Sequence, residues 1–199
     1  MTEIILASQS PRRRALLEQI GLQFHIDAPN IDEGACEGCS PAAYVAALSA
    51  EKAGVVAARH LGEQPLVIAA DTVVVMGNRI LGKPDSKKEA FQMLASLSGK
   101  SHLVYTGVTL QQGETVLTQG SVTEVKFRRL NLLEIKDYVE TREPYDKAGG
   151  YGIQGMGALF VEEIHGDFYN VMGLPLHLVN LMLREFGVNC MHQNEDGKV

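Results

Sequence analysis

Short apolar runs bounded by turn residues predict the strands of a sheet. The run at residues 66–76 is β-branched and almost wholly apolar, which is typical of a central strand buried on both faces. Two further strands are predicted on either side of Gly113, at 102–110 and 115–127. Shorter strands are expected at residues 4–7, 24–28 and 158–164.

Helices are expected where apolar residues recur at helical spacing behind a capping residue. Ser10-Pro11 and Ser40-Pro41 each place an N-cap before a proline at the first helical position, which predicts helices that end at Gly21 and near His60. Further helices are expected at 87–97, from 132 to before Pro144, and at 175–186. The pattern predicts an α/β fold, a mixed central sheet with flanking helices.

Composition bounds the architecture and the partners. The chain has 199 residues, of which 45% are apolar, so one domain over residues 1–188 is expected, or two small lobes around a cleft, with a polar tail at 189–199. Eighteen basic and twenty-four acidic side chains give a net charge of −6. That charge opposes the broad positive field that a nucleic acid or an anionic membrane requires, so neither is an expected partner. A polyanion must therefore meet a local basic cluster.

The compartment expected from the sequence is the cytoplasm. The first residues do not have the order of charged and apolar regions of a secretory signal, and no stretch reaches the ~18 apolar residues of a membrane span. An odd number of cysteines, three, suits a reducing environment.

The first candidate for chemistry is the segment that joins the first strand to the first helix. The N-terminus of a helix offers free N–H groups and a positive dipole end, which suit phosphate. Ser8 and Ser10 add hydroxyl donors, and Arg12 and Arg13 in the first turn add charge. The alternative is a capped helix with solvated arginines, which is the interpretation favoured for Arg14.

Lys52 is a second, weaker candidate. It falls on one helical face with Val45, Leu48 and Val55. A lysine there extends its ammonium to the edge of the core, or else reaches from behind into a charged cleft.

Asp71 gives the clearest signal, because it interrupts the apolar run of the central strand. An unpaired buried carboxylate costs several kcal/mol, so it should meet a cation, a metal or dedicated donors. Two interpretations stay open: a structural pair with an arginine, or a catalytic or metal-binding role beside Thr72. Glu33 is either the second carboxylate of a Mg²⁺ site or a surface acid.

Two later segments add polar groups on irregular backbone. Lys83 lies in a Gly-Lys-Pro sequence after a predicted turn, and residues 146–155 carry four glycines. Such a loop lets the backbone approach a flat or charged ligand closely, although glycine-rich loops are also common linkers.

Taken together, these residues resemble the Maf family of nucleoside triphosphate pyrophosphatases. The ordered motifs that carry the resemblance span Ala7 to Leu176: A-S-x-S-P-R-R, D-E, E-K-A, A-D-T, G-K-P, D-K-A-G-x-Y-G-I-Q and V-x-G-L-P-L. The resemblance implies an inosine-triphosphatase-like fold with two lobes around a cleft, and a homodimer. It also implies hydrolysis of a nucleoside triphosphate to the monophosphate and pyrophosphate with a divalent metal, Mg²⁺, Mn²⁺ or Co²⁺.

By position, the resemblance implies a role for each motif. Asp71 would be the general base and a metal ligand together with Glu33, and water would attack the α-phosphorus. The residues that would hold the triphosphate are Ser8, Arg13, Lys52 and Lys83.

Three positions distinguish branches of the family. Arg12, Thr72 and Gln154 are similar to the branch that hydrolyses dTTP and UTP, and differ from the branch that acts on 7-methyl-GTP. A glutamine amide both donates and accepts, which suits the edge of uracil or thymine. The alternatives are a pyrophosphatase for 7-methyl-GTP or another modified or purine nucleotide, and a non-catalytic nucleotide-binding regulator of septum formation.

Overall fold

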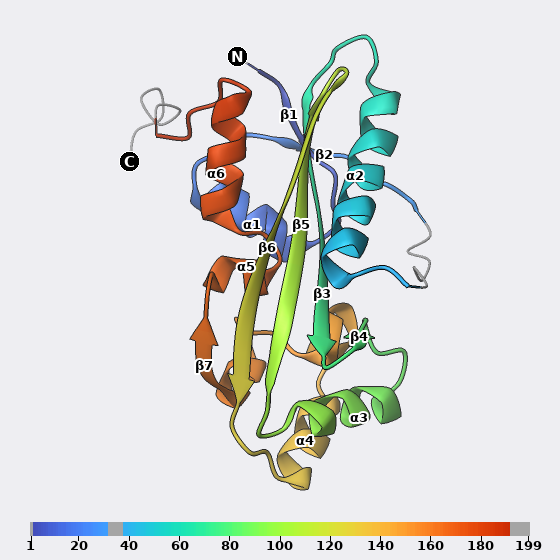
Figure 1. The fold of residues 1–199 in the computed structure, drawn as a ribbon, viewed down its shortest axis with the longest axis vertical. Helices are drawn as coiled ribbons and strands as arrows, with labels where there is room; N and C mark the ends of the chain where they lie inside the picture. The colour runs from blue at the N-terminus through green and yellow to red at the C-terminus, as the bar shows by residue number, and fades with distance from the viewer. Residues whose placement is uncertain (1, 32–37, 192–199) are drawn as a thin grey trace. The chain divides into compact units, whose positions relative to one another are not determined.

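A computed structural model describes residues 2–31 and 38–191. Its sheet has the strand order β2-β1-β3-β5-β6-β7, with β4 paired to β3 (Figure 1). The strands are β1 (Ile4–Leu6), β2 (His25–Ile26), β3 (Leu66–Met76), β4 (Arg79–Leu81), β5 (Ser101–Gln112), β6 (Thr115–Phe127) and β7 (Val161–His165). The helices are α1 (Pro11–Gln19), α2 (Pro41–Arg59), α3 (Lys87–Leu97), α4 (Leu132–Val139), α5 (Phe168–Met172) and α6 (Leu176–Glu185).

The sheet is mixed, as the sequence predicts. Strand β1 runs parallel to β2 and β3, whereas β4 pairs with β3 and β7 with β6 in antiparallel fashion. Helices flank this sheet, which confirms the expected fold class.

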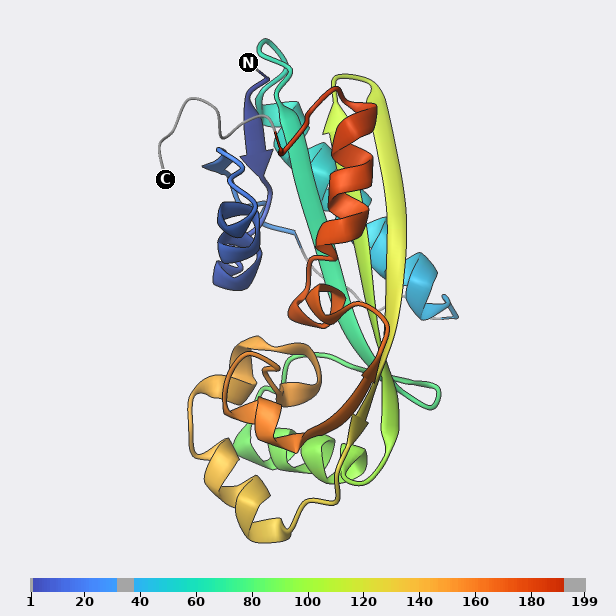
Figure 2. The same ribbon diagram turned by 90° about the vertical axis from the view of Figure 1, so that its left-hand side faces the viewer.

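Contacts within the chain divide it into two compact units, each built from separate segments. The first unit contains Met1–Asp71, Thr106–Ser121 and Gly173–Val199, and the second contains Thr72–Tyr105 and Val122–Met172. Strands β3, β5 and β6 contribute residues to both units. Within the first unit, α2 lies on one face of the sheet and α1 and α6 lie on the other (Figures 1 and 2).

The core beneath α2 explains the direction of the charged residue in β3. Side chains alternate between the two faces of a strand, so every second residue of β3 faces the same way. Val67 and Ala69 pack with Ala53 and Val56 of α2 in one buried cluster. Asp71 continues that alternation, and its carboxylate is therefore directed to the α2 side of the sheet.

Both proline-led helices begin where the sequence predicts. The Ser10 hydroxyl accepts a hydrogen bond from the N–H of Arg13, and the Ser40 hydroxyl accepts one from the N–H of Ala43. A close approach then fixes α2 on the sheet: a Cβ added to Gly107 of β5 would lie 2.6 Å from the carbonyl carbon of Val45. Only glycine at this position leaves room for the helix backbone.

The second unit is built around α3, α4 and an aromatic cluster. Helices α3 and α4 pack together (Figure 2). Beside them lie the 3₁₀ turns Glu143–Asp146, Ala148–Gly150 and Met156–Phe160. Edge-to-face ring contacts join the side chains of His102, Phe127, Tyr138, Tyr151 and Phe160.

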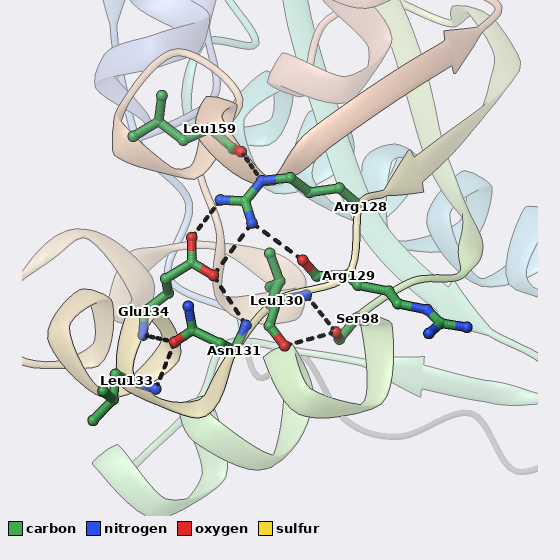
Figure 3. Close-up of polar contacts among 8 residues, drawn as sticks. All are labelled: Ser98, Arg128, Arg129, Leu130, Asn131, Leu133, Glu134 and Leu159. Carbon is green, nitrogen blue, oxygen red and sulfur yellow. Dashed lines mark hydrogen bonds and ion pairs between the residues drawn. The ribbon is translucent and has the colours of Figure 1, made fainter.

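The start of α4 is fixed by a network of polar contacts (Figure 3). Asn131 and Glu134 form a capping box, in which each side chain accepts a hydrogen bond from the other residue's N–H. Arg128 donates to both oxygens of the Glu134 carboxylate, at 2.6 and 3.2 Å, and its Nε donates to the Leu159 carbonyl at 2.8 Å. The helix that carries Tyr138 is therefore anchored at its first turn.

Several boundaries differ from the sequence prediction. The strand expected at 158–164 begins only at Val161, because residues Met156–Phe160 form a 3₁₀ turn. The strand expected at 24–28 is reduced to His25–Ile26, and the short helix α5 was not predicted. On α2, the buried residue is Val56, whereas Val55 is half-buried.

Helix α6 ends at Glu185, close to the predicted end at 186. Of the expected polar tail at 189–199, residues 192–199 lie outside the described part of the chain. Within the described residues, none of the helices combines the length and apolar character needed to cross a membrane.

Candidate functional site

The turn between β1 and α1 is held against the first part of β3. The N–H of Ala7 donates to the carbonyl of Ile68 at 2.8 Å, so the chain leaves the sheet at the next residue, Ser8. The Ser8 side chain is buried, and its Oγ accepts hydrogen bonds from the N–H of Ser10 at 3.1 Å and from Nη1 of Arg13 at 3.3 Å. The hydroxyl thus braces the turn that starts the helix.

Arg13 joins the N-terminal turn to a segment far along the chain. Its Nε donates to the carbonyl of Gly173 at 2.8 Å. Gly173 has a φ of 105°, a left-handed conformation that favours glycine. The guanidinium is therefore fixed in direction at the positive end of α1. By contrast, Arg14 pairs with Glu18 at 2.8 Å on the exposed face, as expected, and Arg12 is half-buried.

Lys52 and Asp71 form a buried ion pair. The Nζ of Lys52 lies 2.5 Å from Oδ1 of Asp71, and both side chains are only 9% exposed. Each charge offsets part of the cost of burying the other. The partner of Asp71 is thus the lysine of α2, where the structural interpretation of the sequence expected an arginine.

The described carboxylate at this site suits a divalent cation whose coordination is completed by substrate phosphates and water. Within residues 2–31 and 38–191, no cluster of three or more His, Cys, Asp or Glu side chains is arranged to hold a metal ion. Mg²⁺ is typically bound through one or two carboxylates together with substrate phosphates and water. Asp71 fits that requirement, whereas Glu33, the second predicted ligand, lies outside the described residues.

The Gly-Lys-Pro sequence and the glycine-rich segment lie against each other in the second unit. The N–H of Gly149 donates to the carbonyl of Gly82 at 3.0 Å, and a Cβ added to Gly150 would lie 3.6 Å from Cγ of Pro84. Lys83 is therefore presented on backbone that the glycine-rich segment braces. The Lys83 side chain is exposed.

Gln154 lies in a tight turn of the same segment. The N–H of Gly155 donates to the carbonyl of Gly152 at 3.1 Å, which closes a β-turn with Ile153 and Gln154 at its centre. Gln154 is exposed. Thr72, the third position that distinguishes the branches, is half-buried and directly follows Asp71 in β3.

Sequence reasoning missed Glu143, which lies beneath this turn. Its carboxylate accepts hydrogen bonds from the hydroxyl of Tyr138 at 2.8 Å and from the N–H groups of Met156 and Gly157 at 2.9 and 3.0 Å. Burial opposes ionisation of this group, but the donated hydrogen bonds outweigh it, so the pKa of Glu143 lies below its ordinary value. In the sequence, the closely spaced glycines that follow Glu143 are the one indication that this segment is tightly packed.

The structure thus brings the predicted motifs together in pairs. Arg13 meets Gly173, Lys52 meets Asp71, and Gly82 meets Gly149. Each pair joins segments that are separate in sequence. In the first unit these contacts fix a cationic helix start, which suits a small polyanion, and a buried carboxylate paired with a lysine in an α/β protein.

Comparisons with known proteins identify the family. A family model described as "Maf-like protein" matches residues 3–186. The chain belongs to this family, as the motifs in its sequence indicated.

Curated relatives match over nearly their whole length. The chain is 48% identical to the dTTP/UTP pyrophosphatase of Symbiobacterium thermophilum, over 94% of this chain and 95% of that protein. It is 50% identical to the dTTP/UTP pyrophosphatase of Moorella thermoacetica, over 95% of this chain and 97% of that protein. The solved structure of the Ham1 protein of Staphylococcus aureus matches 63% of this chain and 71% of its own, at 14% identity and a TM-score of 0.42, too distant to add to the assignment.

Proposed function

We propose that this protein hydrolyses dTTP and UTP to the corresponding monophosphate and pyrophosphate. Its class, a nucleoside triphosphate pyrophosphatase, follows from relatives of that name at 48 and 50% identity over nearly the full chain. The structural observation that carries the proposal is the buried ion pair of Lys52 and Asp71, because a buried carboxylate beside a specific charged partner is a recurrent feature of functional sites.

Binding of the triphosphate is assigned to fixed cations. A triphosphate carries about four negative charges, which must be compensated before a nucleophile can approach phosphorus. Arg13 offers a guanidinium held by Gly173 and Ser8, and Ser8 and the start of α1 offer hydrogen-bond donors. Lys52 and Lys83 supply the remaining positive charge in the proposal.

Proton transfer is assigned to Asp71. Its carboxylate takes the proton of a water molecule that attacks the α-phosphorus, and pyrophosphate leaves. Lys52 holds one carboxylate oxygen at 2.5 Å and so fixes the direction of the base. Burial of the base also limits access of bulk water to it, which strengthens its electrostatic contacts.

The proposal includes a divalent cation, with Asp71 and Glu33 as its protein ligands. When bound, such an ion neutralises phosphate charge and acidifies water. Asp71 then has two tasks, as ligand and as proton acceptor, and Lys52 compensates the carboxylate while the site is without substrate.

Recognition of the base is assigned to Gln154, with Arg12 and Thr72. A primary amide presents both a donor and an acceptor, the pattern that complements a carbonyl beside an N–H on uracil and thymine. Cytosine reverses that pattern at the same positions, so an amide held in one orientation favours uracil and thymine over cytosine. This assignment predicts a preference for UTP over CTP.

A panel of triphosphates tests the proposal directly. The purified protein is given dTTP, UTP, CTP and 7-methyl-GTP with Mg²⁺, Mn²⁺ or Co²⁺, and the monophosphate, pyrophosphate and orthophosphate are quantified. We expect monophosphate and pyrophosphate in equal amounts, fastest from dTTP and UTP. Faster turnover of 7-methyl-GTP would place the protein in the other branch. Nucleotide binding with no pyrophosphate release would instead support a regulator.

A further inference from the structure

We propose that Glu143 is a positioning residue that sets base specificity by holding the turn that carries Gln154. The inference rests on the proposed function, because it takes Gln154 as the reader of the base. Glu143 itself touches no substrate in this scheme. It acts through the backbone of residues 152–157, and every contact in the argument lies within the second unit.

The glycines of this turn have no space for a side chain because Glu143 occupies it. A Cβ added to Gly155 would lie 2.5 Å from Cδ and Oε1 of Glu143. A Cβ added to Gly152 would lie 3.0 Å from Oε1 of Glu143 and 2.6 Å from Cε of Lys147. Gly155 therefore packs directly on the Glu143 carboxylate, and Gly152 packs on that carboxylate and on the Lys147 side chain.

Hydrogen bonds hold the same backbone from two directions. After the turn, the N–H groups of Met156 and Gly157 donate to the Glu143 carboxylate. Before it, the N–H of Gly152 donates to the hydroxyl of Tyr138 at 3.2 Å, and that hydroxyl donates to Glu143 at 2.8 Å. Gln154 thus lies between two points that are fixed by a single carboxylate.

The holding group is itself fixed. Tyr138 projects from α4, whose first turn is anchored by Arg128 and the capping box (Figure 3). Lys147 donates to the backbone carbonyl of Glu143 at 2.7 Å. A rigid support of this kind fixes the position of the Gln154 backbone and the direction in which its side chain leaves it, and discrimination between bases depends on that placement.

The chemistry requires a carboxylate. Oε1 accepts from Tyr138 and Gly157, and Oε2 accepts from Met156, so all donors are met by acceptor-only oxygens. In Glu143→Gln the shape is kept, but the new NH₂ group must face at least one N–H or O–H donor, whichever way the amide is turned. That variant loosens the turn without opening a cavity.

The experiment measures specificity, not activity alone. The ratio of kcat/KM for UTP to that for CTP is determined in the full-length protein. We expect Glu143→Gln to lower this ratio about tenfold, through a higher KM for UTP, because a hydrogen bond to a charged group is lost. Gly155→Ala should do the same. Its added methyl would meet the Glu143 carboxylate directly.

A matched control is Glu140→Gln. It removes a nearby carboxylate whose partner is Lys87 at 2.5 Å, and both of these side chains are exposed. This variant should keep the wild-type ratio within about twofold, as surface pairs contribute little. Combining Glu143→Gln with Gly155→Ala should lower the ratio no further than either change alone, because both act on one contact.

Distinct outcomes overturn the inference and the function beneath it. If Glu143→Gln keeps the wild-type ratio, or loses UTP and CTP turnover equally, the positioning role is wrong while the pyrophosphatase assignment stands. If Gln154→Ala keeps the wild-type ratio, Glu143 does not set base specificity by positioning Gln154, and the inference is wrong. If the wild-type protein hydrolyses neither nucleotide, the proposed function fails. In that case, amide hydrogen exchange at Met156 and Gly157 still tests whether Glu143 holds the turn. Faster exchange in Glu143→Gln supports this role, and unchanged exchange overturns it.

Discussion

The two compact units bury polar groups in opposite ways. The first unit buries an ion pair, Lys52 and Asp71, directly beneath α2. The second buries a neutral pair, in which Nε2 of His102 lies 2.8 Å from the hydroxyl of Tyr151. Burial lowers the pKa of His102 to about 4 and raises the pKa of Tyr151, so both groups stay uncharged near neutral pH.

The contrast separates reactive groups from supporting ones. In the first unit, the charged groups assigned to the reaction are fixed by ion pairing and by the start of α1. In the second unit, the Gln154 side chain, assigned to the nucleotide base, is exposed, and what is fixed is its backbone. Catalytic power and specificity therefore depend on different kinds of contact, and mutations in the two units should affect different measurements.

Asp71→Asn is the strongest test of the first unit. The amide keeps the size of the side chain but removes the proton acceptor, so we expect turnover of UTP with Mg²⁺ to fall about 100-fold or more. The matched control is Asp137→Asn, at an exposed position of α4, which should stay within about twofold of wild type. Near-normal turnover of Asp71→Asn would remove Asp71 from the mechanism.

Lys52→Met tests whether the ion pair is a folding requirement. Removing the ammonium leaves a buried carboxylate without its cation, and we expect the free energy of unfolding to fall by about 4 kcal/mol in urea denaturation. Replacing both partners, as Lys52→Met with Asp71→Leu, should recover much of that loss. A single variant as stable as wild type would show that the pair contributes nothing to folding.

Gly107→Ala tests the packing that carries Lys52. The added methyl would meet the carbonyl carbon of Val45 at 2.6 Å, and a helix backbone cannot move aside easily. We expect a loss of about 3 kcal/mol in unfolding free energy. Gly120→Ala in β6 is the control, because its Cβ would meet only the Thr106 carbonyl at 3.7 Å. Equal stability of the two variants would contradict the close approach of α2.

His102→Phe tests the neutral interior of the second unit. Because the folded pKa of His102 is lowered, its contribution to stability is present above the unfolded pKa of about 6.5 and is lost as the pH falls toward 4. Between pH 7 and pH 5 this loss is about 2 kcal/mol of unfolding free energy. In His102→Phe the pH dependence should be flatter by that amount, whereas His177→Gln at an exposed position should not change it. An unchanged slope in His102→Phe would mean that the histidine is charged when folded.

The sequence predicted the buried polar groups of the first unit better than those of the second. An acidic residue in an apolar strand can be recognised without any structure, and Asp71 was found in this way. Its pairing with Lys52 was not predicted from the residues, because it depends on which face of β3 meets α2. Strand alternation places Asp71 on the side of Lys52 only once it is known which face of β3 packs against α2.

Glu143 shows why the second unit was harder to predict. It lies among polar residues that look solvated, between Arg142 and Asp146. Nothing in that pattern indicates that a carboxylate turns inward to hold a glycine-rich segment 9 to 14 residues later. The same packing delays the start of β7 to Val161, where a strand was expected from residue 158. Long-range contacts of this kind leave no local periodicity.

The bond from Arg13 to the Gly173 carbonyl also sets an order of assembly on the ribosome. The two residues are 160 positions apart, and the first unit needs segments from the beginning, the middle and the end of the described chain. At ordinary rates of synthesis, Arg13 emerges roughly 10 to 30 seconds before its acceptor exists. At the end of that interval, when Met172 has been added, the second unit's segments are complete and the first unit's are not. The guanidinium that is assigned to the triphosphate therefore reaches its final orientation late, and a nascent chain that stops before Gly173 lacks the carbonyl that orients it.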